Sequence, residues 1–335
     1  MNSTGTLIIT NGDAVALKIA RTGIEGTVLP WRDVLHEGPV AGGLGLEALS
    51  HIRASFIEDR GWVGPGEARA AFARRDAVIR AWRDYNRLVL MFEHDLYDQL
   101  QLIQVLDFLA VEGAEPDRIE IVCVDSYPGV HTFHGLGQLE AAQLADLYDH
   151  PEAVSHRMLD TARSAWQALG SDDPRRIEAL LLQDTSALPF LAAALLRLLQ
   201  ELPSSATGLS LTEQQILELL NSGPRSFSEL FLAAQAREAA PFYGDSVFWW
   251  RVERLAHLME PLLSVTAAPA PHLAGTGTPS NGQRIAEITE AGRRILRGGH
   301  VQHGSRGLRW LGGVLLGGCH LDYLWNAATQ QVVLG

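Results

Sequence analysis

Residues 88–109, LVLMFEHDLYDQLQLIQVLDFL, contain an apolar run, a polar turn and an amphipathic segment in direct succession. The run at 88–92 is typical of a buried strand, and Glu93, His94 and Asp95 follow it at once. Apolar side chains then recur at positions 100, 103, 106 and 109, which is the spacing of one helical face. The stretch therefore predicts a strand, a sharp turn and a helix. Ligands of open parallel sheets bind at such strand ends, so the turn is a candidate site.

Three further apolar segments also end in polar residues. Right-handed crossovers between parallel strands would place the carboxyl ends of all four at one edge of a sheet. We therefore expect residues 1–136 to form an α/β domain, with a parallel sheet of about four or more strands and flanking helices. The polar residues expected along its edge, beside those of the first stretch, are Asn11 and Asp13, Asp33 and His36, and Asp125 and Ser126.

The rest of the chain is expected to be helical and then winged-helix-like. Residues 137–204 predict a helical segment, and residues 205–335 predict a winged-helix-like domain with a C-terminal β-hairpin. Three helices followed by two strands, near 261–265 and 284–288, is the order of a winged helix. The third helix offers only Arg251 and Arg254 as basic candidates, so structural or protein contacts are favoured over DNA contacts.

Composition and charge restrict the possible partners. With 47% apolar and 20% charged residues among 335, the chain can bury a sizeable core and has no apolar window long enough to span a bilayer. The net charge of −12 lies entirely before residue 205, and an acidic N-terminal part repels polyanions. There is no export signal, and the two cysteines form no paired motif. A cytoplasmic protein without a membrane partner is expected.

The first candidate residues are those of the polar turn. A histidine between two carboxylates suits acid–base chemistry in type, so His94 is expected to be the acid–base or ligand group, with Glu93 and Asp95 as catalytic orienters. Asp98 lies four residues after His94, which predicts a shared face in the first helical turn. Asp95 suits the N-cap of that helix. The alternative is that these residues only tie loops together by hydrogen bonds.

Ligand contacts are expected from Asn11, Asp13, Trp31, Asp33, His36 and Asp98. Three of them have a structural alternative: Asp13 would cap a helix, Asp33 would cap a turn, and Trp31 would cover the core instead of forming a stacking wall. His36 and His94, together with the carboxylates of the edge, have the donor types for a divalent metal. They lack a spaced signature such as HExxH, so whether a metal binds stays open, and no cofactor is indicated.

Two other features bear on this edge. His131 and His134 lie in a loop, residues 128–135, that could fold over it, although a surface loop with two exposed histidines is favoured slightly. The arginines of a helix expected near residues 67–85 mostly suit a solvated face, and only one or two would reach back towards the strand ends. Walker A, GxGxxG and GxSxG motifs are missing from the expected places, which removes the best-known nucleotide and hydrolase signatures.

Several separated motifs occur in an order that resembles a known family. ITNGD, LPWRDVLHEGP and FEHDLYDQLQL resemble the bacterial family of domain of unknown function 1835. HGLGQLEAAQLADLY, LPFLAAALLRLLQELP, TEQQILELL and RWLGG resemble its longer members. The resemblance covers most of the chain and implies an α/β domain followed by a helical and winged-helix-like part. It brings no established activity, so it assigns no catalytic residue.

Three functional hypotheses follow. The first is binding of a small polar ligand, a nucleotide or a phosphorylated metabolite, at the carboxyl edge of the sheet, with hydrolase or transferase chemistry. The second is a non-enzymatic, ligand-sensing regulator whose winged-helix-like domain contacts DNA or a protein. The third is a scaffold without a site, which is favoured if the candidate side chains are buried and mutually satisfied.

Overall fold

The computed structural model describes residues 5–267, 284–301, 307–317 and 323–335, and these residues include twelve α-helices. The chain divides into two compact units, Met1–Arg197 with Trp310–Val314, and Leu198–Arg309 with Leu315–Gly335. The predicted α/β class is confirmed for the sheet of the first unit, which is largely parallel. Among the described residues, none of the helices combines the length and the apolar character that a bilayer span requires.

The first unit is built on a five-stranded sheet with the order β2-β1-β4-β5-β6. The first four strands in this order are mutually parallel, and only β6 at the edge is antiparallel. The central register sets Ile8 beside Val89 and Leu90 beside Ile121. The strands are β1 (Thr6–Thr10), β2 (Thr27–Pro30), β4 (Arg87–Glu93), β5 (Ile119–Val124) and β6 (Glu152–Ala153).

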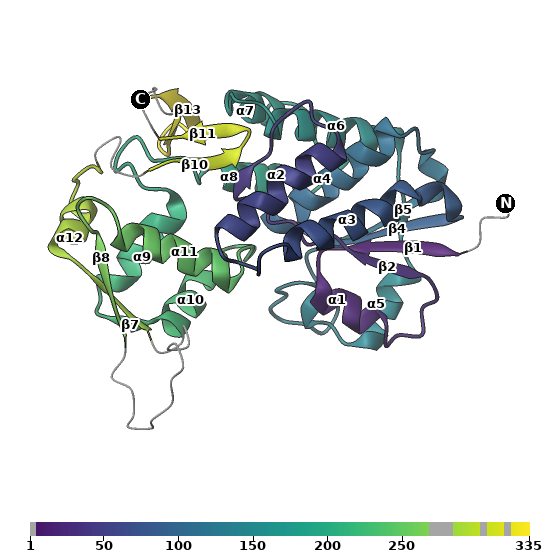
Figure 1. Ribbon diagram of the computed structural model, residues 1–335, viewed down its shortest axis with the longest axis horizontal. Helices are drawn as coiled ribbons and strands as arrows, with labels where there is room; N and C mark the ends of the chain where they lie inside the picture. Colours follow the sequence, from purple (N-terminus) through teal and green to yellow (C-terminus); the bar gives the residue numbers. More distant parts are fainter. Residues whose placement is uncertain (1–4, 268–283, 302–306, 318–322) are drawn as a thin grey trace. The chain divides into compact units, whose positions relative to one another are not determined.

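Helices cover both faces of this sheet, which explains why its central strands read as continuous apolar runs. On one face, Ile8, Val89 and Met91 pack with α1 and α5; α3 and α4 lie on the other face (Figure 1). The α-helices of this part of the chain are α1 (Asp13–Ile19), α2 (Leu46–Asp59), α3 (Glu67–Arg80), α4 (Leu96–Val111), α5 (Ala141–Tyr148), α6 (His156–Leu169), α7 (Arg175–Leu181) and α8 (Leu191–Leu199). Short 3-10 turns occupy Trp82–Asp84, Pro116–Arg118 and Leu136–Gln138.

A small second sheet closes the loop after β2. Strand β3 (Gly38–Pro39) pairs in parallel with β10 (Arg309–Gly312), so Leu311 lies beside Gly38 although more than half of the chain separates them. Strand β11 (Val314–Leu316) follows β10 in the same sheet. Sequence analysis did not anticipate this pairing, because two-residue strands carry no periodicity.

The described residues of the second unit include the helices α9 to α12 and an antiparallel sheet with the order β7-β9-β8. Ser210 with Glu213 and Ser226 with Glu229 form capping boxes, which fix where α9 and α10 begin. The loop expected between the two main strands lies outside the described residues. The elements are α9 (Leu211–Leu220), β7 (Arg225–Ser226), α10 (Phe227–Gln235), α11 (Asp245–Ala256), β8 (Leu263–Ala267), β9 (Arg284–Ile288) and α12 (Glu290–Leu296), with a hairpin of β12 (Tyr323–Asn326) and β13 (Gln331–Leu334).

Packing against the sheet, more than helix propensity, is expected to stabilise α1. Ile19 on this helix is fully buried, whereas Leu17 is 64% exposed. Replacing Ile19 by alanine should therefore lower the free energy of unfolding by about 2–5 kcal/mol, through lost burial and an unfilled cavity. Denaturant unfolding of the full chain, followed by circular dichroism, measures this. Leu17→Ala is the matched control and should change little; equal losses in the two variants would contradict the packing described here.

Candidate functional site

Strands β1 and β4 and helix α4 bring four of the candidate residues together. Asn11, directly after β1, donates from Nδ2 to Glu93 Oε1 at 3.1 Å and to Asp98 Oδ2 at 3.0 Å. The side chain of Asp95 caps α4 by accepting the Asp98 N–H at 2.9 Å, as its place before the helix predicts. Asp98 in turn accepts the backbone N–H of Glu93 at 2.8 Å. The expected convergence of the β1 and β4 ends is thus present.

Glu93, Asp95 and Asp98 form a cluster of buried carboxyl groups. One oxygen from each lies within 4.8 Å of the others, and the three residues are 4%, 6% and 0% exposed. Gln99 also belongs to this turn, because its Nε2 donates to the Glu93 carbonyl at 2.6 Å. Oxygen donors at this spacing are those that Mg²⁺, Mn²⁺ or Ca²⁺ prefer, so the carboxyl cluster could hold a divalent cation.

Burial shapes the electrostatics of the carboxyl cluster. Desolvation, with the neighbouring charges of Asp98 and Asp95, raises the pKa of Glu93 to about 10. Burial also raises the pKa of Asp98 to about 7, against the hydrogen bonds from Asn11 and the Glu93 amide. The pKa of Asp95 is raised for the same reasons, burial first and the charge of Asp98 second. Without a cation, the cluster therefore retains protons at neutral pH, because adjacent carboxylates in a dry site repel one another.

The loop after β5 folds over the carboxyl cluster. The backbone N–H of Leu136 donates to Glu93 Oε1 at 2.6 Å. Gly135 stands at φ +131° directly against the Glu93 carboxyl group, where a side chain would collide with its oxygens. His131 and His134 in the same loop are both exposed. The loop thus covers the edge through its backbone.

The His94 side chain is not part of the carboxyl cluster, contrary to the shared helical face that its spacing from Asp98 predicted. It precedes the extended N-cap residue Asp95 and therefore lies outside the helix. Its ring is half-buried and lies about 6 Å from the rings of Phe133 and Phe190, at 6.1 and 6.0 Å between centroids. Burial lowers the pKa of His94, and the charge of Asp125 opposes this only in part. The imidazole is consequently neutral near pH 7.

Asp13 does not cap α1, which was the structural role expected of it. It is the first residue of α1, whose N-cap is Gly12, and its side chain caps no backbone N–H there. The carboxylate is 61% exposed and forms an ion pair with Arg32 at 2.5 Å. Asp13 therefore lies outside the carboxyl cluster, and its carboxylate is paired with Arg32 at the surface.

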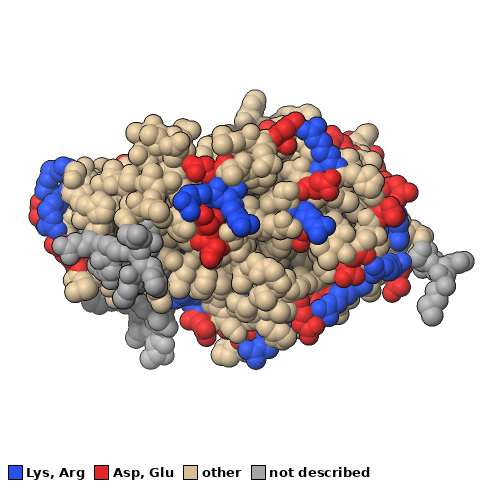
Figure 2. Space-filling model, turned by 90° about the horizontal axis from the view of Figure 1, so that it is seen from above, with Lys and Arg blue, Asp and Glu red and all other residues tan. Residues whose placement is uncertain are grey.

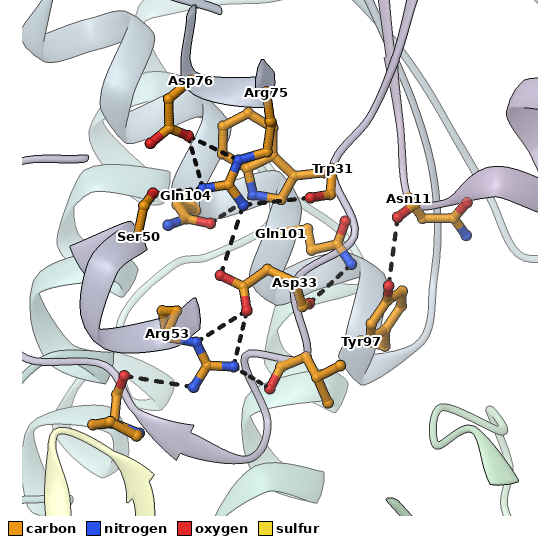
Figure 3. Close-up of polar contacts among 12 residues, drawn as sticks. Asn11, Trp31, Asp33, Ser50, Arg53, Arg75, Asp76, Tyr97, Gln101 and Gln104 are labelled. Atoms are coloured by element: carbon orange, nitrogen blue, oxygen red, sulfur yellow. Dashed lines mark hydrogen bonds and ion pairs between the residues drawn. The ribbon is translucent and has the colours of Figure 1, made fainter. Parts of the chain in front are cut away.

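Asp33 and Trp31 lie inside the protein, where Figure 3 shows them among two buried arginines. Asp33 accepts hydrogen bonds from Arg53 Nε and Nη2 at 3.0 and 2.9 Å, and Arg75 Nη1 lies 3.8 Å from its other oxygen. Trp31 is fully buried, donates to Gln104 Oε1 at 2.6 Å, and has the Arg75 guanidinium 4.3 Å from its ring centroid. Trp31 is thus a core residue and does not form the expected stacking wall.

His36 and the rest of its loop are held by the same network. His36 is 2% exposed and lies edge-on to Tyr97, with 6.0 Å between ring centroids. Arg53 also donates to the carbonyl oxygens of Val34 and Glu37, at 2.7 and 2.5 Å. The network around Asp33 thereby fastens the loop after β2 to α2 and α3, which is the structural alternative for these residues.

Sequence reasoning missed the partners of Asp33. Arg53 and Arg75 are 0% and 3% exposed. Arg75 belongs to the helix near residues 67–85, whose arginines were expected mostly to be solvated, and no prediction was made for Arg53. Arg75 lies three residues after Phe72 and four before Ile79, both of which are buried. This helical spacing was the signal that placed Arg75 on the inner face.

Comparisons with known proteins leave the family open. No protein-family model matches the chain, and no curated protein matches it. Among solved structures, it is similar to the DNA-binding, cleavage and re-ligation domain of Plasmodium falciparum topoisomerase II, with a TM-score of 0.46 and 11% identity. The match covers 100% of this chain but only 55% of that one. A likeness at this level carries no functional argument.

The network around Asp33 should be essential for stability. Asp33→Asn removes the negative charge and leaves Arg53 buried without its counter-ion, which should cost about 3–5 kcal/mol of the free energy of unfolding. Denaturant titration measures the loss. The control is Asp13→Asn, which breaks the exposed pair with Arg32 and should change stability little. If Asp33→Asn lowers the free energy of unfolding by no more than Asp13→Asn does, the buried ion pair of Asp33 with Arg53 is not important for stability.

The carboxyl cluster should make the cation-free protein less stable as pH rises. Glu93 and Asp98 bind protons more tightly in the folded chain, since their pKa values rise from 4.5 and 3.8 to about 10 and about 7. Their stabilising contribution is complete below the unfolded values and is lost as pH rises through the folded ones. Melting temperatures measured with a chelator from about pH 5 to about pH 9 should fall, and Asp98→Asn should flatten the slope. If the melting temperature depends on pH equally in the wild type and in Asp98→Asn, the predicted link between the protonation of Asp98 and stability is refuted.

Proposed function

We propose that the carboxyl edge of the first unit's sheet binds a divalent cation together with a small polar ligand. The ligand class is a nucleotide or a phosphorylated metabolite, and the activity that suits such a site is that of a hydrolase or transferase. The observation that carries the proposal is the carboxyl cluster, Glu93, Asp95 and Asp98, with an oxygen of each within 4.8 Å of the others.

Charge supports a cation at this position. Three adjacent carboxyl groups lose hydration on burial, and their raised pKa values reflect that cost. A divalent cation would replace the bound protons and cancel the repulsion between Asp95 and Asp98. Asn11 bridges Glu93 and Asp98, so its amide would hold both carboxyl groups in position.

A cation also accounts for how a phosphate could bind in an acidic part of the chain. Phosphate oxygens coordinate Mg²⁺ readily, and carboxylates alone would repel them. His94 is a neutral, half-buried imidazole one residue after Glu93, and at neutral pH it can accept a proton. Its assigned role is that of an acid–base or ligand-contacting group at the rim of the site.

The alternative is a non-enzymatic regulator, in which the same edge only binds its ligand and the second unit contacts a partner. The order of α9, β7, α10, α11, β8 and β9 supports a winged-helix-like domain. A protein partner suits this unit better than DNA. Arg251 is buried in an ion pair with Glu201 at 2.7 Å, and Arg294 pairs with Glu260 at 2.5 Å. Basic and acidic side chains are also intermixed on the face drawn in Figure 2.

Thermal-shift measurements with Mg²⁺, Mn²⁺ and Ca²⁺ on the full chain test the cation. A cation at about 100 times its Kd should stabilise the protein by about 2.7 kcal/mol and raise the melting temperature. Glu93→Gln and Asp98→Asn keep the side-chain size but remove ligand charge, so both should lose this shift. Asp13→Asn, which changes an exposed acid at the same edge, should retain it. If no cation shifts the wild type, or the cluster variants respond like the wild type, the cation site is refuted.

The ligand is tested in the presence of the stabilising cation. Nucleoside phosphates and sugar phosphates are added to the wild type and to His94→Ala, and the further rise in melting temperature is recorded. A ligand at the rim should stabilise the wild type more than His94→Ala. Product formation by the wild type would then favour the enzyme, and binding without turnover would favour the regulator. Stabilisation that is equal in both proteins would remove His94 from the site.

A further inference from the structure

A cavity apart from the carboxyl cluster lies among helices α2, α3, α4 and α6 of the first unit. Its volume is about 490 Å³, which is within the usual range for small-molecule sites. Asp98 lies in the first turn of α4 at the carboxyl cluster, whereas Asp107 lines this cavity near the other end of the helix. At 1.5 Å per residue, about 14 Å of helix axis separates the two.

The wall of this cavity is mainly apolar and aromatic. Leu46 and Leu49 contribute from α2, Phe108 and Val111 from α4, and Trp166 from α6. Two of the apolar lining residues are exposed to solvent: Val111 is 62% exposed and Leu44 is 39% exposed. Exposed apolar surface next to a cavity of this size suits a ligand with an apolar or aromatic body.

Most of the charges around the cavity are neutralised by neighbours. Arg80 Nη2 pairs with Glu47 at 3.0 Å, and Glu112 pairs with Arg83 Nη1 at 3.2 Å. Asp107 differs from them. Within the described part of the chain, the Asp107 carboxylate accepts no hydrogen bond. The positive charge of Arg163 lowers the pKa of Asp107, but the effect of burial is larger. Burial raises the pKa of Asp107 to about 6, so the group is mostly ionised at neutral pH.

The surroundings of Asp107 favour a positive charge. Its helix, α4, has no basic residue in its last turn, where the helix dipole attracts cations. Phe108 and Trp166 line the same cavity, and aromatic rings attract organic cations through their faces. An anionic ligand would meet the Asp107 carboxylate, while Arg80 is already engaged by Glu47. A metal ion would find only the Asp107 carboxylate and the carboxylate of Glu112, which is already paired with Arg83, among the lining residues.

We propose that this cavity binds an organic cation, an amine with an apolar or aromatic body, whose ammonium group pairs with Asp107. Its body packs against Phe108, Trp166 and the leucines of α2. The site is independent of the cation proposed for the carboxyl cluster, because the two share no residue.

The probes are 2-phenylethylammonium, benzyltrimethylammonium and the neutral 2-phenylethanol, each titrated calorimetrically into the full chain. Both ammonium compounds should bind more tightly than the alcohol. Asp107→Asn keeps the side-chain size, and it should weaken ammonium binding about tenfold or more while leaving alcohol binding unchanged. Glu112→Gln, which alters a paired acid of the same cavity, should bind like the wild type. Trp166→Leu should weaken benzyltrimethylammonium more than the alcohol, because it removes an aromatic face.

Circular dichroism of each variant checks that the fold is intact. The proposal is overturned if the alcohol binds as tightly as the ammonium compounds. It is also overturned if Asp107→Asn binds them like the wild type, or if no ammonium compound binds at millimolar concentration. Loss of divalent-cation binding in Glu93→Gln would leave these results unchanged, so failure at one site is distinguishable from failure at the other.

Discussion

The burial of three carboxyl groups where β4 meets α4 is the constraint on which the first unit depends. Charged groups lose their hydration in such a place, and the chain compensates with the Asn11 amide, the start of α4 and the Leu136 N–H. These contacts come from β1, from α4 and from the loop after β5. The cluster therefore links these three segments at one edge of the sheet, and its protonation is tied to their positions.

The network around Asp33 solves the same physical problem differently. There a buried carboxylate meets the arginines of α2 and α3, so the charge is balanced by the protein itself. Gly38 completes the arrangement: it adopts φ +83°, and a side chain at that position would collide with Phe56 and Arg53. A buried carboxylate that is paired with arginines of the same protein indicates a structural role. Buried carboxyl groups that have no cationic partner and retain their protons indicate a candidate ligand site.

Local patterns were sufficient to predict much of the first unit. An apolar run ending in Glu93, followed by apolar residues at helical spacing, predicted β4 and α4, and Asp95 was recognised as the cap. The meeting of Asn11 with this turn followed from parallel topology alone. The direction of His94 could not be predicted in this way, because the extended backbone at Asp95 sets it and helical spacing begins only afterwards. Arg53 has the same helical spacing as Arg75, between the buried Leu49 and Ile57, but its partner Asp33 lies on a different segment, so local sequence could not predict the pair.

The pairing of β10 with β3 has a practical consequence for anyone who divides this protein. Leu311 and Gly312 complete the small sheet beside Gly38 and Pro39, and residues 310–314 belong to the first compact unit. A fragment that stops at residue 197 would leave the backbone groups of β3 without their partners. To produce the first unit with this sheet intact, residues 310–314 must be co-expressed with residues 1–197 or joined to them by circular permutation.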